Sequence, residues 1–412
     1  MNMLGVYTLM RRTGDLKLIQ EINRSIILDM IRKQAPISRS EIAKRINISP
    51  TTVTSAVNEL MNEGFVREDG IGVSNGGRKP VLLRFDPNSH FIIGVSITNS
   101  FIKISEMNLE AEIRRKEIYS TNLLFGQSVI NHVLELIRQF LEKTEYKNRC
   151  VGISIITPGI VDAQKGIISY NTKLDLRDVP LKKLVEQQFG LPTYLDNDTN
   201  AFVLAEKHFG PFSQFKDLLY ITVGDGVGSG LMINGSIYRG HKGSSGEFGH
   251  TTVDRGSGVR CECGNVGCLE SYVRWPSIYS KIISAIMTRG QKTKIQELLP
   301  EDISQITPEI FVKAINLGDE ISLKILDEVV SYLAAGIVNY IHLFNPEIII
   351  LGGEIVQDNP IFLEAINQHV SKHVIPVLRD DITIRTTSLG TEFEMLGAAA
   401  VLLQEKFQSP VI

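Results

Sequence analysis

Apolar residues recur at helical spacing three times near the start of the chain, and two alternating strands follow them. The pattern predicts three helices within residues 20–62 and strands over 65–68 and 81–85. A glycine-rich tip separates the strands, as in a β-hairpin. The predicted buried faces are Ile22, Ile26, Ile27, Met30 and Ile31 in the first helix, Ile42, Ala43 and Ile46 in the second, and Val53, Val57 and Leu60 in the third.

Capping residues indicate where the second and third helices begin and end. Ser38 and Glu41 have the spacing of a capping box, in which each residue caps the backbone amide of the other. Asn47 suits the left-handed backbone of a turn, and Ser49 and Pro50 suit the N-cap and first position of the next helix. The two helices are therefore predicted to form a helix-turn-helix.

The exposed face of the third helix carries short hydrogen-bonding side chains, which suit base edges in a DNA major groove. The first 86 residues are also mildly basic, with 13 Lys and Arg against 9 Asp and Glu, whereas the whole chain has a net charge of −3. We predict a winged helix-turn-helix over residues 1–86; the alternative is a small interaction domain with a solvated polar face. The predicted DNA contacts are Ser49, Thr51, Thr52, Thr54, Ser55 and Asn58 on the helix, and Arg78 and Lys79 on the wing.

From residue 91 the pattern changes to buried strands and long helices. Two sets of hairpin-forming strands, each followed by a glycine-containing segment, predict an α/β body with two lobes. Asn234-Gly235 predicts a two-residue hairpin turn. The predicted elements are strands over 91–97, 101–107 and 151–156, a helix over 126–144, strands over 218–223 and 231–233 around a glycine-rich turn at 224–230, and a strand over 347–351.

Length and composition limit the class of protein. A chain of 412 residues is long enough for two or three domains, and 43% hydrophobic with 22% charged residues is typical of a globular protein. No apolar run approaches the ~18 residues that a membrane-spanning helix needs. The N-terminus lacks the pattern of a signal peptide. These features, with few cysteines, predict a cytoplasmic protein.

Three of the four cysteines lie close together, shortly after a histidine. Zinc prefers thiolate and imidazole ligands, and four protein ligands with no open position are typical of a structural site. Glu247 and Glu270 flank this segment, so a metal would fix the positions of two carboxylates. The alternative is four unrelated residues. The predicted zinc ligands are His250, Cys261, Cys263 and Cys268.

These motifs resemble the ROK family of bacterial repressors and sugar kinases, in its repressor form with an N-terminal winged helix and closest to its xylose-repressor type. The resemblance covers nearly the whole chain. The motifs that carry it are Ile22-Asn23-Arg24, Gly-Gly-Arg78, Asn197-Asp198, Glu247-Phe-Gly-His250 and Cys261-x-Cys263-x4-Cys268-x-Glu270.

The resemblance implies a two-lobed, actin-like fold that binds a sugar between its lobes. It places lobe I at residues 90–200, completed by a C-terminal helix over 392–406, and lobe II with the zinc loop at 201–391. Carboxylates and amides suit vicinal sugar hydroxyls, since they accept and donate several hydrogen bonds. The sugar-binding residues implied by the resemblance are Asn197, Asp198, Glu247, His250 and Glu270.

The chain departs from the kinases of the family at their phosphate-binding loop. The family's Asp-x-Gly-Gly-Thr is replaced by Ser96-Ile97-Thr98-Asn99-Ser100, without the acid and without both glycines. Asp225 places a negative charge where the kinases usually have Thr. Asp198 matches the family's catalytic base, but a carboxylate at that position can also accept a sugar hydroxyl in a sensor. We therefore expect no catalytic residues and no enzyme activity.

The expected function is repression of a carbohydrate catabolic operon, for which xylose is a candidate, with release of the DNA when a sugar or sugar phosphate binds. The expected partners are a palindromic double-stranded operator and a second copy of the chain, as homodimer or homotetramer. Two alternatives stay open. The chain could be an ATP-dependent sugar kinase with an accessory DNA-binding domain, or a repressor controlled by a transporter component instead of a free sugar.

Overall fold

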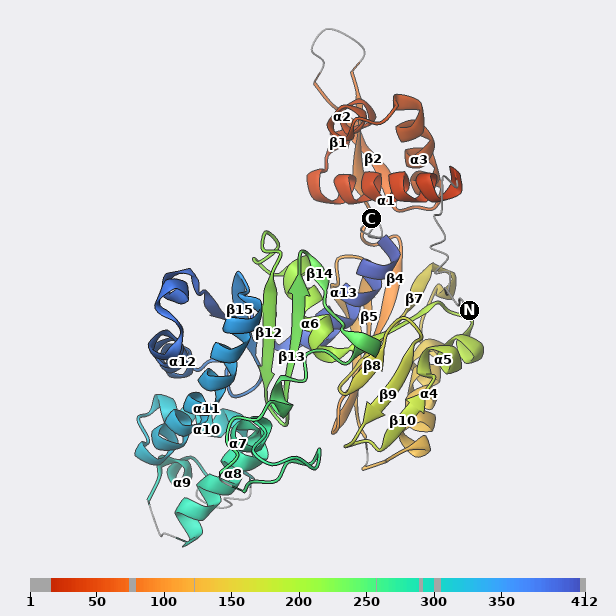
Figure 1. Cartoon of the computed structure of the whole chain (residues 1–412). Coiled ribbons are helices and arrows are strands. Elements are labelled where there is room, and N and C mark those ends of the chain that lie inside the picture. Colours follow the sequence, from red (N-terminus) through yellow and green to blue (C-terminus); the bar gives the residue numbers. More distant parts are fainter. Residues whose placement is uncertain are drawn as a thin grey trace, which may run out of the picture.

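The computed structural model describes residues 16–73, 79–121, 123–256, 258–288, 292–299 and 305–407. Within these residues the chain forms a small N-terminal domain and two α/β lobes, each built on one five-stranded sheet (Figure 1). In the described part of the chain, no helix is long and apolar enough to cross a membrane.

The N-terminal domain is a three-helix unit with a three-stranded sheet in the order β1-β3-β2. The sheet contains one strand that the sequence analysis did not predict. This strand, β1, has only two residues. The tip between β2 and β3, with Arg78, lies outside the described residues, whereas Lys79 is described and exposed. The elements are α1 (Leu16–Gln34), β1 (Ile37–Ser38), α2 (Arg39–Ile46), α3 (Pro50–Asn62), β2 (Val66–Ile71) and β3 (Val81–Phe85).

Local signals set the ends of α2 and α3 largely as predicted. The Ser38 hydroxyl accepts a hydrogen bond from the amide of Glu41 at 3.2 Å, and the Ser49 hydroxyl accepts one from the N3 amide of α3 at 3.1 Å. Asn47 adopts a left-handed backbone with φ 53°. The side chain of Glu41 pairs with Arg45, so the predicted capping box is formed from one side only.

Lobe I contains the sheet β11-β7-β4-β5-β6, in which β4 runs parallel to β7 and antiparallel to β5. Helices α4 and α5 cover one face of it, and a small sheet β10-β9-β8 adjoins it. The elements are β4 (Phe91–Ile97), β5 (Phe101–Asn108), β6 (Ile113–Ser120), α4 (Gln127–Glu142), β7 (Cys150–Thr157), β8 (Ile160–Asp162), β9 (Ile167–Asn171), β10 (Leu176–Val179), α5 (Leu181–Phe189) and β11 (Thr193–Asn197).

Lobe II contains the sheet β14-β13-β12-β15-β16 and most of the remaining helices. A large apolar cluster joins this sheet to α8, α10, α11 and α12. The elements are β12 (Leu218–Val223), β13 (Val227–Ile233), β14 (Ser236–Ile237), α7 (Glu270–Val273), α8 (Trp275–Ile283), α9 (Lys294–Leu298), α10 (Pro308–Asn316), α11 (Glu320–Phe344), β15 (Ile348–Gly352), α12 (Pro360–His373) and β16 (Ile384–Thr386).

Two helices, α6 (Asp198–Phe209) and α13 (Phe393–Phe407), lie between the two sheets (Figure 1). α13 packs against β4 and β7 of lobe I, and α6 packs against α13 and against β12 and β13 of lobe II. The expected lobe boundary between residues 200 and 201 therefore falls inside α6. Both lobes share the apolar layer that these two helices form.

The glycine-rich segment of lobe II corrects one prediction. The sequence suggested a turn over 224–230, but β13 already begins at Val227. Gly228 and Gly230 lie within this strand where α6 crosses it, and a Cβ on Gly230 would be 2.5 Å from the carbonyl oxygen of Thr199. The two glycines therefore permit close helix–strand packing.

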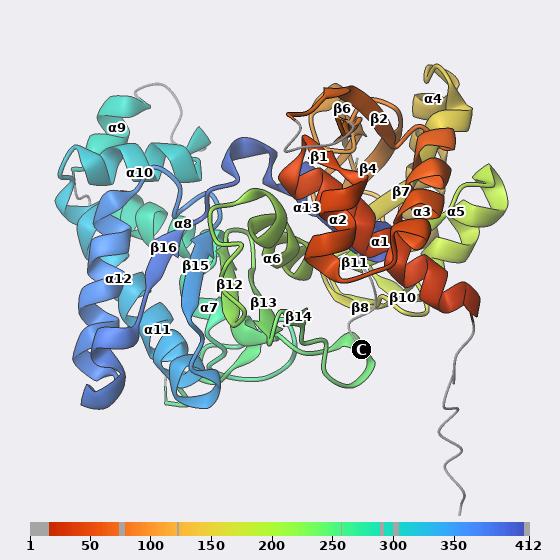
Figure 2. The same cartoon turned by 90° about the horizontal axis from the view of Figure 1, so that it is seen from above.

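Seen from above, the N-terminal domain lies over lobe I (Figure 2), and it packs there against the end of α13. The rings of Phe65 and Phe407 meet edge to face, with centroids 5.5 Å apart, and the Ser25 hydroxyl donates to the carbonyl of Phe407. One buried cluster includes Ile27 of α1, Phe85 of β3 and Leu402 of α13. The N-terminal domain and lobe I are therefore joined by a continuous apolar core.

Candidate functional site

A cleft of about 860 Å³ lies between the lobes, and side chains from both sheets line it. Strand ends of lobe I, the first turn of α6, the loop after β14 and the cysteine-containing loop all contribute to its wall. The five residues that the family resemblance implies for sugar binding all line this one cleft. They are Asn197, Asp198, Glu247, His250 and Glu270.

The predicted metal ligands also come together. The ligand atoms of His250, Cys261, Cys263 and Cys268 all lie within 4.8 Å of one another. The distance from Cys261 Sγ to His250 Nδ1 is 3.6 Å, and that between the sulfurs of Cys263 and Cys268 is 3.7 Å. A tetrahedron with ~2.3 Å zinc–sulfur bonds has edges of roughly 3.8 Å. The donor set and its spacing therefore fit a zinc ion.

The two ring nitrogens of His250 face different neighbours. Nδ1 is directed to the cysteine cluster, whereas Nε2 lies 3.9 Å from a carboxylate oxygen of Glu247 and the side chain reaches the cleft. A metal on Nδ1 would fix the ring orientation and leave Nε2 as a hydrogen donor toward the cleft. His250 thus connects the candidate metal ligands with the predicted sugar site.

Asp198 and Asn197 stand where β11 ends and α6 begins. Asp198 is the first residue of α6, and burial raises its pKa to about 6. The side-chain oxygen of Asn197 caps α6, and its amide donates to the carbonyl of Gly159 at 3.0 Å. Asn197 therefore has only one N–H left for a ligand, whereas the Asp198 carboxylate retains acceptor capacity.

The two glutamates that flank the cysteine loop differ in their surroundings. Burial raises the pKa of Glu247, and the negative charge of Glu270 adds to this effect. One oxygen of Glu270 accepts a hydrogen bond from the amide of Val227 at 3.0 Å, at the start of β13. Glu270 is thus held by the lobe II sheet, and both carboxylates can accept hydroxyl hydrogens from a ligand.

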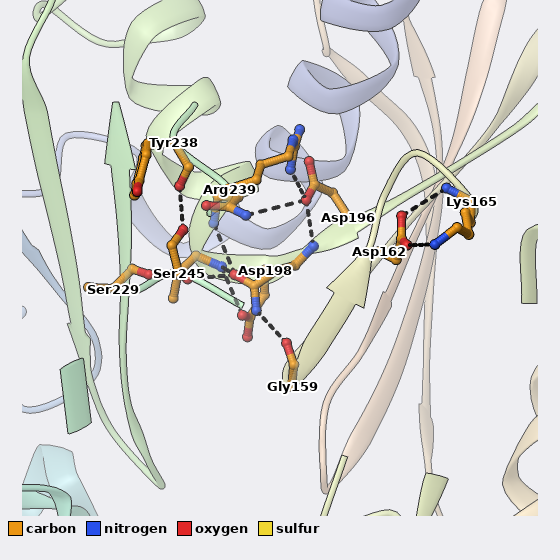
Figure 3. Close-up of polar contacts among 12 residues, drawn as sticks. Gly159, Asp162, Lys165, Asp196, Asp198, Ser229, Tyr238, Arg239 and Ser245 are labelled. Atoms are coloured by element: carbon orange, nitrogen blue, oxygen red, sulfur yellow. Dashed lines mark hydrogen bonds and ion pairs between the residues drawn. The ribbon is translucent and has the colours of Figure 1, made fainter. Parts of the chain in front are cut away.

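An ion pair that the sequence analysis did not find connects the two lobes beside this site. Arg239, in the loop after β14, donates to Asp196 of β11 at 2.5 Å, and the Asp196 side chain is 1% exposed (Figure 3). Asp196 directly precedes Asn197 and Asp198, and the Arg239 loop leads to Glu247. The only hint in the sequence is that Asp196 directly precedes the Asn197-Asp198 motif.

The segment 96–100, which the sequence analysis expects in place of the kinase phosphate loop, lies at the same cleft. Ser96 of β4 lies opposite Lys103 of β5 in the sheet register. The Lys103 ammonium donates hydrogen bonds to both carboxylate oxygens of Glu394 on α13, at 2.8 and 2.6 Å. Across the cleft, Lys173 donates to the carbonyl oxygen of Asp225 at 2.9 Å. Among the described residues, seven carboxylate side chains and two lysines line the cleft.

The predicted DNA-reading face of α3 is exposed, except for the half-buried Thr52. Thr52, Thr54 and Ser55 already use their hydroxyls locally. Thr52 lies 2.8 Å from the capping Ser49 hydroxyl, Thr54 donates to a backbone carbonyl, and Ser55 donates to Glu59 at 3.4 Å. Arg39 of α2, which sequence reasoning missed, lies 3.4 Å from the Asn58 amide oxygen. It adds a cation beside this face, which suits a phosphate contact.

Comparison with known proteins agrees with this organisation. The ROK family pattern matches residues 92–405, and a winged helix-turn-helix DNA-binding pattern matches residues 21–67. The chain is 31% identical to the xylose repressor of Caldicellulosiruptor bescii over 402 residues, covering 96% of this chain and 99% of the relative.

Two solved structures extend the comparison. A ROK family transcriptional regulator, described as a homologue of the Escherichia coli MLC protein, has 26% identity and a TM-score of 0.82, covering 93% of this chain and 96% of its own. A ROK family glucokinase from Streptomyces griseus, solved with glucose and AMPPNP, has 26% identity and a TM-score of 0.66, covering 75% of this chain and 98% of its own. These matches confirm the fold class that the sequence predicts, and the chain belongs to the ROK family with an N-terminal winged helix-turn-helix.

Proposed function

We propose that this chain is a sugar-responsive transcriptional repressor that binds a palindromic operator as a homodimer or homotetramer and releases it when sugar binds. The regulated operon would encode carbohydrate catabolism, and xylose is the first sugar to test because the relative from C. bescii is named for it. The observation that carries the proposal is the convergence of all five expected sugar residues in one cleft of a chain that also has an exposed helix within the winged helix-turn-helix match.

Zinc would act in this proposal as a structural ion. His250 and the three cysteines would hold it, and its chemistry would be to fix the loop between Glu247 and Glu270. The ion would also set the tautomer of His250, so that Nε2 donates toward the cleft. Two carboxylates and one N–H donor would then face the sugar in fixed positions.

We further propose that the chain does not transfer phosphate. The carboxylates of the cleft outnumber its lysines, and one of the two lysines is already paired with Glu394. Phosphoryl transfer depends on positioning and neutralising the phosphates. A cleft of this charge disfavours a nucleotide, although the family also contains kinases such as the S. griseus glucokinase.

The route from cleft to DNA would use α13. Its first residues, Phe393 and Glu394, line the cleft, and its last residue, Phe407, contacts Phe65 of the winged helix. A sugar that binds one lobe arrangement better than another would shift the population toward that arrangement. The winged helices of a dimer would then move away from the operator spacing. We place the domain boundaries near residues 86, 200 and 391 in this scheme.

The test combines DNA binding with ligand binding. Operator duplexes are selected from a random library with the full-length protein, and their mobility shift is measured with and without xylose, glucose and their phosphates. We expect a palindromic site and its release by one sugar. ATP turnover is measured in parallel. Release only by a transporter component, or ATP-dependent phosphorylation of a sugar, would contradict the proposal.

A further inference from the structure

One row of register partners crosses all five strands of the lobe I sheet. Asp196 of β11 pairs with Ile156 of β7, and the row continues through Ser96 of β4 and Lys103 of β5 to Ile118 of β6. Neighbouring strands are ~4.8 Å apart, so the row extends over roughly 19 Å. The cleft follows this edge of the sheet, because Ser96, Lys103 and Ile118 all line it.

The two ends of the row carry different chemistry. At the β11 end, Asn197 and Asp198 follow Asp196 in the chain. Asp198 lines the cleft together with Glu247 and Glu270, so this end is acidic. At the first residue of β5 and on β6 the cleft wall is apolar, with Phe101 50% exposed and Ile118 52% exposed. Phe101 lies two residues from Lys103 and so shares its face of the sheet. Large apolar side chains exposed inside a cleft are a surface for a ligand.

The region between the two ends is polar and continuous with both. The Lys103–Glu394 ion pair lies there, and the negative charge of Glu394 contributes to the field at Asp198. Phe393 precedes Glu394 and also lines the cleft. An elongated ligand would therefore meet carboxylates first, then an ion pair, and finally an apolar wall.

Length and charge both restrict the ligand. The row of register partners extends over roughly 19 Å. One six-membered sugar ring of ~1.5 Å bonds, with its hydroxyls, covers only a fraction of that length. The cleft volume of about 860 Å³ also exceeds the need of a single ring. A phosphate would meet seven carboxylates, while the two lysines are engaged by Glu394 and by the carbonyl of Asp225. Sugars are uncharged, and their C–H faces can pack on aromatic rings.

We infer that the effector is an uncharged saccharide of two or more units, whose second unit packs on a platform formed by Phe101 and Ile118. The inference rests on the proposed sensing function and makes its ligand more specific. The acidic end would recognise the first unit through its hydroxyls, and the platform would select for chain length.

The test is isothermal calorimetry on the full-length, zinc-loaded protein with xylose, xylobiose and xylotriose, and with glucose, cellobiose and maltose. Xylose 5-phosphate, glucose 6-phosphate and AMPPNP are the charged probes. The measurements are repeated with Phe101→Ala and, as a matched control, with Phe125→Ala, which removes a 56% exposed ring that does not line the cleft. Ile118→Thr is the second platform variant, because it keeps a β-branched residue in β6.

We expect a disaccharide or trisaccharide to bind more tightly than its monosaccharide. Phe101→Ala should weaken the longer ligand roughly three- to tenfold and leave the monosaccharide and the Phe125→Ala protein unchanged. Equal affinity for one and two units, without any effect of either platform substitution, would overturn the platform and leave the sensing function intact. Preferred binding of a phosphate or of AMPPNP would overturn the uncharged ligand. Binding of none of the saccharides would contradict the sensing function itself.

Discussion

Replacing Arg239 by methionine should destabilise the protein by about 3 kcal/mol. The Asp196 carboxylate is 1% exposed and the Arg239 side chain 24% exposed, so the substitution leaves a buried carboxylate without its cation. Losing one partner of a buried ion pair typically costs about 3–5 kcal/mol. We expect the lower end of this range, because the amide of Asn197 still donates to Asp196 at 2.8 Å and Arg239 is partly solvated. Methionine preserves the apolar stem of the side chain.

The free energy of unfolding is measured by urea denaturation, followed by circular dichroism and by fluorescence. The fluorescence reports on lobe II, because Trp275 is the single tryptophan of the chain and packs near Phe311. Two probes are needed since a chain with several domains can unfold in separate steps. The same variant should also bind sugar more weakly, because the ion pair links the segment of Asp198 to the loop of Glu247.

The decisive control is the double variant Asp196→Asn with Arg239→Met. It removes both charges, so it should be more stable than Arg239→Met alone. If the two single substitutions each cost less than about 1 kcal/mol and their effects simply add in the double variant, the pair contributes no coupling energy and our reasoning is refuted.

Three further predictions follow from the site and the core. Cys263→Ser should lower the bound zinc measured by mass spectrometry to well below one ion per chain and reduce the thermal midpoint, whereas Cys150→Ser, outside the cluster, should retain the metal. Because burial raises the pKa of Asp198 to about 6, sugar affinity should increase as the pH rises through about 6 and the carboxyl becomes a charged acceptor; calorimetry should find this dependence lost in Asp198→Asn. Gly230→Ala should cost about 1–3 kcal/mol in urea denaturation by crowding α6, while Gly224→Ala, whose Cβ would meet nothing within 4 Å, should be nearly neutral.

The winged helix was predictable almost element by element, because its signals are local. The Ser49 cap, the left-handed Asn47 and the apolar spacing of α3 are all readable within a few residues. The strand β1 was missed because its two residues pair with β3, and such long-range pairing has no local signature. The small sheet β10-β9-β8 was missed because its strands have only 4, 5 and 3 residues.

The candidate site divides in a similar way. The four possible zinc ligands were readable because they lie within one short stretch of the chain, and the structure brings them together. The pair of Arg239 and Asp196 could not be predicted, because its partners come from different lobes and only the fold places them in contact. The apolar wall of Phe101 and Ile118 was also hidden, since an alternating strand does not reveal which face lines a cleft.

The glycines at 224–230 show why the same sequence feature can have two physical causes. A glycine-rich segment after a strand suits either a phosphate-binding loop or a backbone that another element approaches closely. Here a Cβ on Gly228 would lie 2.9 Å from Thr199, and one on Gly230 would lie 2.5 Å from the same residue's carbonyl. Packing against α6 therefore explains both glycines without any phosphate. These two glycines therefore provide no argument for a phosphate-binding loop.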